Sequence, residues 1–226
     1  MNKKSKKSRS LVLYTLVVIV LFVALFAINQ ATNKKDNMNQ TTTAEAPSTT
    51  SQPVMGNEDA KVSIVEFGDY KCPSCKAWGE QVWPQLKKEY IDSGKAKFSY
   101  TNVLFHEEES KLGALAGEAI LKSNPEDFWN FHKALFDAQP KDNHDGLWIT
   151  EEKLLEVAKL SVPAIDLEQF QLNFKSSENQ ASVDLDQKLV EQFNIKQTPT
   201  IMINNIVIAN PFDYAAITAA IEQEMK

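Results

Sequence analysis

The chain has 226 residues, of which 43% are hydrophobic and 9% aromatic, enough for one packed domain of ordinary size. It carries 24 basic and 30 acidic residues, a net charge of −6, and without the five basic residues of positions 1–10 the balance is 19 basic to 30 acidic. This acidity argues against a nucleic-acid partner, because phosphate contacts need clustered Lys and Arg.

The N-terminus has the pattern of a membrane anchor. Residues 1–10 contain no acidic residue, and residues 11–28 are uncharged. A helix over that run would be about 27 Å long, close to the hydrocarbon thickness of a bilayer. Because basic residues stay on the cytoplasmic side, we predict a cytoplasmic tail over 1–10, a single transmembrane span over 11–28 and an extracytoplasmic remainder at the cell membrane. A cleaved signal peptide is the alternative, although small residues are poorly placed for cleavage.

Residues 29–52 are rich in Asn, Gln, Thr and Ser, so they are predicted to form a flexible linker that buries too little apolar surface to fold. One domain is predicted over 53–226. Its first strand is expected over 62–68, a β-branched run that ends in a Gly-Asp loop signal. Apolar residues at helical spacing then continue to Gly94, with a kink at Pro84, and alternation over 97–102 predicts a second, parallel strand.

A long, mostly helical stretch follows as far as Phe193. Its helix starts are assigned to the candidate caps Ser110, Asp127, Thr150, Asp166 and Ser182.

Strands return only near the end of the chain. The apolar runs 201–203 and 206–208 flank Asn204-Asn205, which predicts a hairpin with a two-residue turn. A last helix is expected after Asp213. The order of β-α-β, helices and then β-β-α predicts an α/β fold.

The chain has two cysteines, in the sequence Cys72-Pro73-Ser74-Cys75 directly after the first strand. Residues three apart on a helix are about 5–6 Å apart, so a disulfide can close between them. If Cys72 caps the helix, the free N–H groups of Ser74 and Cys75 and the helix dipole favour its thiolate. Pro73 suits the first helical position, where no N–H is needed. The pattern predicts thiol–disulfide exchange.

Three other interpretations fit the cysteine pair less well. Zinc needs two more ligands, and His106, His132 and His144 show no paired spacing. Covalent haem attachment needs a histidine where the chain has Lys76. A purely structural disulfide would close a very short loop and remove little entropy from the unfolded chain.

Three motifs together resemble the DsbA branch of the thioredoxin superfamily. They are the stretch 66–75, the segment 128–132 and Thr198-Pro199-Thr200. The tethered chain is similar to the disulfide bond proteins of Gram-positive bacteria within that branch. The resemblance covers about 53–226 and implies a thioredoxin fold with a helical insertion at about 108–193.

The resemblance also implies roles for single residues. Cys72 corresponds to an exposed attacking thiol and Cys75 to a buried resolving thiol. Pro199 corresponds to a cis-proline that lies against the disulfide. Glu66 corresponds to a buried acid poised to deprotonate Cys75. The alternative for Glu66 is an ordinary surface residue on an edge strand.

Substrate contacts are expected from Thr198, which would offer backbone hydrogen bonds to a substrate strand, and from Pro73 and Ser74. Strongly oxidising relatives have histidine at the position of Ser74, so the redox poise is left open by the sequence. The expected activity is oxidation of reduced exported proteins, with reoxidation by a DsbB-like, quinone-linked membrane partner. A reductase or isomerase of the same fold, or a non-enzymatic chaperone, is the alternative.

The exchange chemistry itself requires no cofactor. Relatives of the Gram-positive type imply a calcium ion between the insertion and the thioredoxin part, and the matching positions are Gln52, Glu118 and Asp186. Oxygen ligands of this kind suit a hard cation. Ordinary surface carboxylates are the alternative.

Overall fold

The computed structural model describes residues 14, 17–25, 40–142 and 146–226. The chain divides into two compact units, 1–41 and 42–226. In the first unit, residues 17–25 are helical and their side chains are exposed. Within the described residues, no helix combines the length and apolar character needed to cross a bilayer. The predicted tail 1–10 and both ends of the predicted span 11–28 lie outside the described residues.

The second unit is built on a sheet with the strand order β6-β5-β3-β4-β2. Strands β3 and β4 are parallel, whereas β2 pairs with β4, and β5 with β3 and β6, in antiparallel fashion. The strands are β2 (Val54–Gly56), β3 (Val62–Gly68), β4 (Ala96–Asn102), β5 (Thr200–Ile203) and β6 (Ile206–Ile208). The predicted parallel pair and the predicted hairpin are confirmed, and Asn204 has the positive φ, 49°, that its turn requires.

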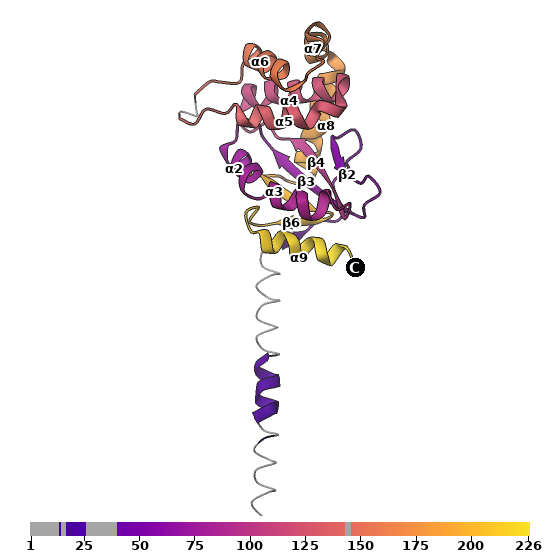
Figure 1. Cartoon of the computed structure of the whole chain (residues 1–226), viewed down its shortest axis with the longest axis vertical. Helices are drawn as coiled ribbons and strands as arrows, with labels where there is room; N and C mark the ends of the chain where they lie inside the picture. Colours follow the sequence, from indigo (N-terminus) through magenta and orange to yellow (C-terminus); the bar gives the residue numbers. More distant parts are fainter. Residues whose placement is uncertain (1–13, 15–16, 26–39, 143–145) are drawn as a thin grey trace, which may run out of the picture. The chain divides into compact units, whose positions relative to one another are not determined.

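Helices lie between β3 and β4, between β4 and β5, and after β6 (Figure 1). They are α2 (Pro73–Gln81), α3 (Trp83–Leu86), the π-helical turn η1 (Lys87–Ile91), α4 (Glu107–Ser123), the 3-10 turn η2 (Pro125–Asp127), α5 (Phe128–Asp137), α6 (Glu151–Ser161), α7 (Leu167–Phe174), α8 (Ser177–Gln192) and α9 (Tyr214–Glu224). The break between α2 and α3 falls at Val82, two residues before Pro84, where the sequence predicts a kink.

Both faces of the sheet are covered, because every residue of β3 is buried. Val62 and Ile64 pack in a core with residues of α2, α3 and α9, whereas Val65 and Phe67 point to the other face and pack with Val190 of α8. A third core lies within the insertion, and α4 to α8 gather at one end of the domain (Figure 1). The cysteines belong to this third core, at the junction of the insertion and the sheet.

Two of the predicted helix starts are wrong. Helix α4 begins at Glu107, where three consecutive glutamates suit the positive end of the helix dipole, and Ser110 lies inside it. Helix α8 begins after Ser176, which caps it, so Ser182 is an interior residue. Thr150 and Asp166 are confirmed as caps whose side chains accept backbone N–H groups.

The predicted flexible linker over 29–52 is wrong at its C-terminal end. Strand β1 occupies Gln40–Thr42, and the Thr43 N–H donates to the Asn205 carbonyl at 2.8 Å. At the last residue of this segment, Gln52 donates to Asp186. Hydrogen bonds order this polar stretch, so its lack of apolar residues wrongly predicts a flexible segment. Residues 29–39 lie outside the described residues.

Candidate active site

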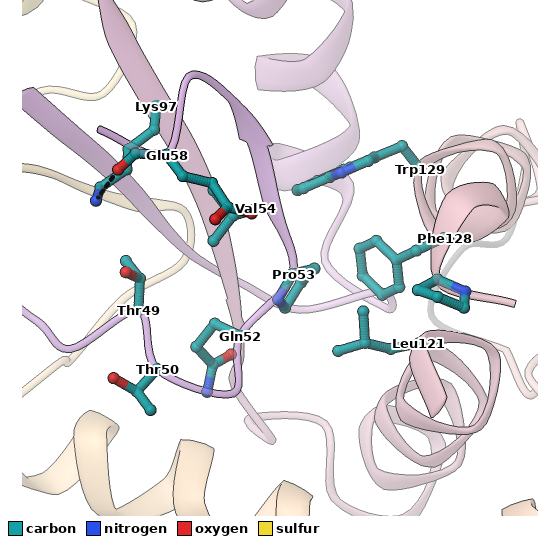
Figure 2. A pocket seen from close by; sticks show the side chains of 11 residues that line it. Thr49, Thr50, Gln52, Pro53, Val54, Glu58, Lys97, Leu121, Phe128 and Trp129 are labelled. Atoms are coloured by element: carbon teal, nitrogen blue, oxygen red, sulfur yellow. Dashed lines mark hydrogen bonds between the residues drawn. The ribbon is translucent and has the colours of Figure 1, made fainter. Parts of the chain in front are cut away.

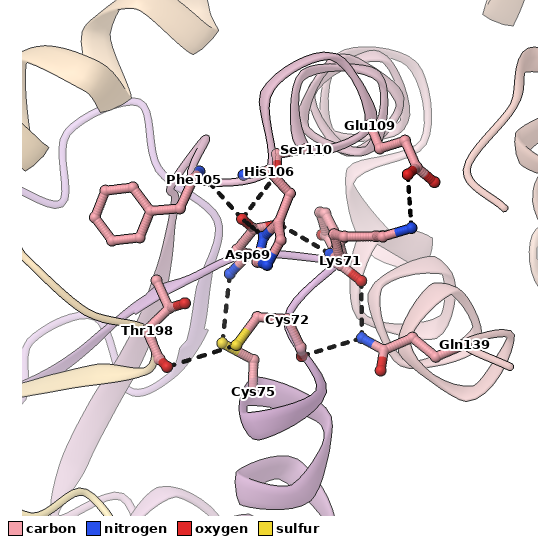
Figure 3. Close-up of polar contacts among 11 residues, drawn as sticks. Asp69, Lys71, Cys72, Cys75, Phe105, His106, Glu109, Ser110, Gln139 and Thr198 are labelled. Atoms are coloured by element: carbon pink, nitrogen blue, oxygen red, sulfur yellow. Dashed lines mark hydrogen bonds and ion pairs between the residues drawn. The ribbon is translucent and has the colours of Figure 1, made fainter. Parts of the chain in front are cut away.

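The cysteine loop connects the end of β3 to the start of α2 (Figure 3). Cys72 is the N-cap of α2, in an extended conformation with φ −73° and ψ 118°, and Pro73 is in the first helical turn. The predicted placement of the pair at a strand-to-helix junction is therefore confirmed. Both cysteines are free thiols.

Cys72 is less accessible than predicted. Its exposed fraction is 7%, against 1% for Cys75, so both thiols are buried and only their order agrees with the roles of attacking and resolving thiol. The physical reason is the loop before β5, which lies over the sulfur: the Cys72 Sγ donates to the Thr198 carbonyl at 3.5 Å. The Thr198-Pro199 peptide is cis, as the resemblance implies.

The environment of Cys72 favours its thiolate and lowers its pKa to about 6. The largest cause is the hydrogen bond from the Cys75 thiol; burial opposes it, and the Thr198 side chain supports it. The sulfur makes no capping hydrogen bond of ordinary geometry, but the N–H groups of Cys75 and Ser74 at the helix start still favour the charged form. Cys72 is thus the thiol of the pair whose ionisation the fold favours.

Cys75 has the opposite character. Burial raises its pKa well above the ordinary value, and its hydrogen bond to Cys72 and the nearby carboxyl of Glu66 raise it further. The Asp69 N–H donates to the Cys75 Sγ at 3.5 Å and offsets a part of this effect. Cys75 therefore stays protonated at neutral pH and needs a base before it can attack.

Glu66 is buried in the middle of β3, with 2% of its surface exposed. The alternative of a surface residue on an edge strand is wrong, because β3 lies between β4 and β5. Its Oε1 has no hydrogen-bond partner among the described residues. Burial raises the pKa of Glu66 well above its ordinary value, and the nearby Cys72 raises it further. A carboxyl of this kind keeps its proton to a higher pH than an exposed glutamate does.

Asp69 organises the loop between β3 and Cys72. Its buried carboxylate accepts hydrogen bonds from the Lys71 and Phe105 N–H groups, from the Ser110 hydroxyl at 2.8 Å and from His106 Nδ1 at 2.7 Å (Figure 3). One side chain thereby joins the cysteine loop to the start of α4. The sequence marks Asp69 only as part of a loop signal.

Gln139, just after α5, holds the cysteine loop from the side of the insertion. It is 5% exposed, and its Nε2 donates to the carbonyls of Tyr70 and Cys72 at 2.8 and 3.1 Å (Figure 3). No sequence pattern identifies this contact, because it joins residues 67 positions apart.

Lys71 forms a second link to the insertion. Its Nζ lies 2.6 Å from Glu109 Oε2, and both side chains are almost fully buried. Burial raises the pKa of Glu109, but the hydrogen bonds from Lys71 and from the N–H groups of Trp148 and Ile149 outweigh it and lower the pKa. The ion pair thereby ties α4 to the residue next to Cys72, and the same glutamate also holds the α5–α6 connection.

The three residues predicted to hold calcium converge on one buried cluster. Gln52 Nε2 donates to Asp186 Oδ1 at 2.6 Å, and Asn102 Nδ2 donates to Asp186 at 2.7 Å and to Glu118 at 3.2 Å. Glu118 is 5% exposed and Asp186 is fully buried, so the alternative of surface carboxylates is wrong. Asn102, at the end of β4, was not predicted.

The cluster brings together two carboxylates and two side-chain amides, and oxygen ligands of this kind suit a hard cation. Burial raises the pKa of both Glu118 and Asp186, and the negative charge of Asp186 raises that of Glu118 further. The Gln52 Oε1 and Asn102 Oδ1 atoms are buried without a partner among the described residues. No group of three or more His, Cys, Asp or Glu side chains suited to a metal occurs in the described part of the chain, so a cation here would need these amide oxygens.

A hollow of about 410 Å³ lies beside this cluster and includes neither cysteine (Figure 2). It runs between the segment that leads into β2 and the start of α5. Its lining residues are Thr49, Thr50, Gln52, Pro53, Val54, Glu58, Lys97, Leu121, Pro125, Phe128 and Trp129.

The sheet contains a parallel β-α-β unit, followed by a β-hairpin and a final helix. A thiol pair starts its first helix, and the carbonyl of the cis Thr198-Pro199 peptide lies 3.5 Å from the first sulfur. These features together define the class of thioredoxin-fold dithiol proteins. A family model described as thioredoxin matches residues 48–223. The chain belongs to this family.

The curated relatives narrow the class to proteins named for disulfide formation. The chain is 41% identical over 194 residues to disulfide bond formation protein D of Bacillus subtilis, covering 86% of each protein. It is 36% identical over 224 residues to the probable disulfide bond formation protein D of Bacillus anthracis, covering 99% of each.

Solved structures agree with this placement. The crystal structure of oxidised BdbD from Bacillus subtilis matches with a TM-score of 0.76 at 41% identity, over 81% of this chain and 98% of that one. DsbA of Chlamydia trachomatis matches with a TM-score of 0.66 at 20% identity, over 76% of this chain and 90% of that one, which shows the shared fold.

Proposed function

We propose that this protein oxidises dithiols in exported proteins by thiol–disulfide exchange at Cys72 and Cys75. The observation that carries the proposal is the asymmetry of the pair: the pKa of Cys72 is lowered to about 6 and that of Cys75 is raised. Interactions that favour the Cys72 thiolate favour the reduced protein, so its disulfide is an oxidant. The likeness to proteins named for disulfide bond formation supports the same direction.

The exchange proceeds in two steps. A thiolate of the client attacks the Cys72 sulfur of the Cys72–Cys75 disulfide, and Cys75 leaves as a thiolate that takes up a proton from Glu66. A second client thiolate then attacks the client sulfur of the mixed disulfide, which oxidises the client by two electrons and releases Cys72 as its stable thiolate. If Cys75 instead attacks Cys72, after its proton passes to Glu66, the client is released in its reduced form.

Thr198 and the cysteine loop would position the client. The Thr198 carbonyl already lies 3.5 Å from the Cys72 sulfur, so a client strand paired with this backbone would bring its own cysteine to Cys72. Pro73 and Ser74 start the helix beside the reacting sulfur and would contact the same client. A reductase or isomerase would use the same groups but would have a more negative reduction potential. A non-enzymatic chaperone would use only the backbone that binds the client.

The proposed location is the outer side of the cell membrane. Five basic residues in positions 1–10 and the uncharged run 11–28 support a single N-terminal anchor with the catalytic domain outside. A DsbB-like, quinone-linked membrane oxidase is the proposed partner that restores the Cys72–Cys75 disulfide, because each turnover leaves the protein with two electrons.

Mixed-disulfide trapping tests the roles of the two cysteines. With reduced clients and an oxidant present, Cys75→Ser should accumulate mixed disulfides through Cys72, because the attacking thiol remains and its resolving partner is gone. Cys72→Ser should accumulate none, since the thiol of Cys75 is buried and protonated. Non-reducing gels give the readout, and equal trapping by both variants would refute the assignment.

We further propose that Gln52, Asn102, Glu118 and Asp186 hold a calcium ion. A bound divalent cation would neutralise the two buried carboxylates and give the orphaned amide oxygens a partner. It would join α4 and α8 to β4, so its role would be structural.

Calcium removal should lower the melting temperature of the wild-type protein. A ligand at 100 times its Kd adds about 2.7 kcal/mol, or roughly 5–10 °C for a domain of this size. Glu118→Gln should lose most of this response to a chelator, and without calcium it should be at least as stable as the wild type because the like-charge repulsion is gone. A wild-type melting curve that does not change in chelator would contradict the proposed calcium site.

A further inference from the structure

Tyr100 lies directly opposite Glu66 in the sheet. The two are register partners in the parallel pair of β3 and β4, and Tyr100 is completely buried. Successive side chains of a strand point to opposite faces, so Glu66 shares a face with Ile64, and Tyr100 shares a face with Phe98. Ile64 and Phe98 lie in the same core, whereas Val65 and Phe67 lie in the core on the other face. The two polar side chains therefore project to the same side of the sheet.

Each of these side chains has a polar atom without a partner. The Tyr100 hydroxyl and the Glu66 Oε1 are both among the buried atoms that make no hydrogen bond to the described residues. A buried tyrosine hydroxyl or carboxyl without a partner is rare, because its desolvation is not offset.

Gly68 shows that the two atoms border the same small volume. A Cβ on Gly68 would lie 3.0 Å from the Tyr100 hydroxyl and 3.1 Å from Glu66 Oε1, and only 2.4 Å from the Tyr100 ring. The two oxygens are not bonded in this structure, but the torsion at the end of a glutamate is soft, so a rotation of the carboxyl can bring its oxygen toward the hydroxyl.

Two of the groups around Tyr100 do not compete with Glu66 as an acceptor for its hydroxyl. The Tyr70 hydroxyl is already bonded to His132 Nδ1 at 3.0 Å, and the ring of His132 meets Tyr100 edge to face at 4.5 Å between centroids. Burial lowers the pKa of His132 to about 3, so it is neutral and carries no competing charge. Burial raises the pKa of Tyr100 well above its ordinary value, and the nearby Tyr70, Cys75, Glu66 and Asp69 raise it further.

We propose that Tyr100 is a positioning residue of the exchange reaction, whose hydroxyl donates a hydrogen bond to the carboxylate of Glu66. The inference rests on the proposed role of Glu66 as the group that exchanges a proton with Cys75. When Glu66 is ionised, the bond stabilises its charge and fixes its orientation. When Cys75 gives its proton to Glu66, the resulting carboxylic acid stays within hydrogen-bonding range of the same hydroxyl. No electron passes through Tyr100.

The test is the pKa of Glu66 in the oxidised full-length protein, in which neither thiol titrates. It is read from the pH dependence of the carbon-13 chemical shift of the Glu66 carboxyl. This signal is assigned as the carboxyl signal that is missing from the spectrum of Glu66→Gln. Removing a donor to a carboxylate disfavours the charged form, so Tyr100→Phe should raise the Glu66 pKa by about one unit further. Exchange that depends on Glu66 should then need a pH about one unit higher.

Tyr70→Phe is the matched control. It removes a buried hydroxyl from the same aromatic cluster, but this hydroxyl is bonded to His132 and not to Glu66. It should leave the Glu66 titration unchanged. An unchanged Glu66 pKa in Tyr100→Phe, or an equal shift in Tyr70→Phe, would overturn the inference. If Glu66→Gln itself leaves exchange unaffected, the proposed role of Glu66 fails instead, so the two failures are distinguishable.

Discussion

Glu66→Gln is expected to slow the attack of Cys75 on a mixed disulfide by about 100-fold at a pH above the pKa of Glu66, where the carboxylate accepts the Cys75 proton, because general acid–base groups contribute about that much or more. Glutamine has nearly the same shape and cannot take up the proton. Burial holds the Glu66 pKa high, so at lower pH the wild-type carboxyl is already protonated and the two rates should converge. Stopped-flow measurement of mixed-disulfide resolution across pH gives the comparison.

The same substitution should make the folded protein more stable at neutral pH. An acid whose pKa is raised on folding costs stability once the pH rises above its unfolded pKa, about 4.5, and a neutral glutamine has no such cost. If Glu66→Gln is slower in exchange but more stable than the wild type, Glu66 acts as a functional acid and not as a packing residue. Wild-type exchange rates in Glu66→Gln at every pH would show that Glu66 has no part in proton transfer.

The second large effect is a pH-dependent stability of the reduced protein. The Cys72 pKa is about 6 in the folded state against 9.0 for an ordinary thiol. A depressed pKa contributes stability that is fully present above pH 9 and is lost as the pH falls to 6. The reduced form should therefore gain roughly 1–2 kcal/mol relative to the oxidised form between pH 5 and pH 8, allowing for solvent screening of a partly accessible sulfur.

Urea denaturation of both redox forms at these two pH values measures the difference. Cys75 does not contribute in this range, because its pKa is raised and it stays neutral in both the folded and unfolded states. The Cys72→Ser variant cannot form the disulfide, so it is the control for the reduced protein alone, and it should lack the gain in stability between pH 5 and pH 8. A difference between the redox forms that is the same at both pH values would mean that the Cys72 thiolate is not stabilised by the fold.

Local patterns were sufficient to predict the elements that carry the reaction. The β-branched run 62–68, the Cys72-Pro73-Ser74-Cys75 loop and the Asn204-Asn205 turn each have a signal within a few residues. Capping signals were less reliable, because Ser182 has the chemistry of a cap but lies inside α8. A serine is compatible with a helix interior, so its presence alone does not mark a boundary.

Some residues of the site could not be predicted from the sequence, because they reach it through contacts between distant parts of the chain. Gln139 and Glu109 reach the cysteine loop from the insertion, and Asn102 completes the buried carboxylate cluster. None stands in a recognisable motif, since glutamine, glutamate and asparagine are ordinary surface residues. The accessibility of Cys72 was also misjudged, because the loop that covers it is 126 residues away in the sequence.

The most direct test of the oxidase assignment is the reduction potential of the Cys72–Cys75 couple, measured in glutathione redox buffers at pH 7. A lowered Cys72 pKa stabilises the dithiol, so the potential should lie above that of thioredoxin, about −270 mV, while Ser74 in place of histidine should keep it below that of DsbA, about −120 mV. We predict a value above about −195 mV, in the oxidising half of this interval. A value near that of thioredoxin would contradict the assignment and favour a reductase.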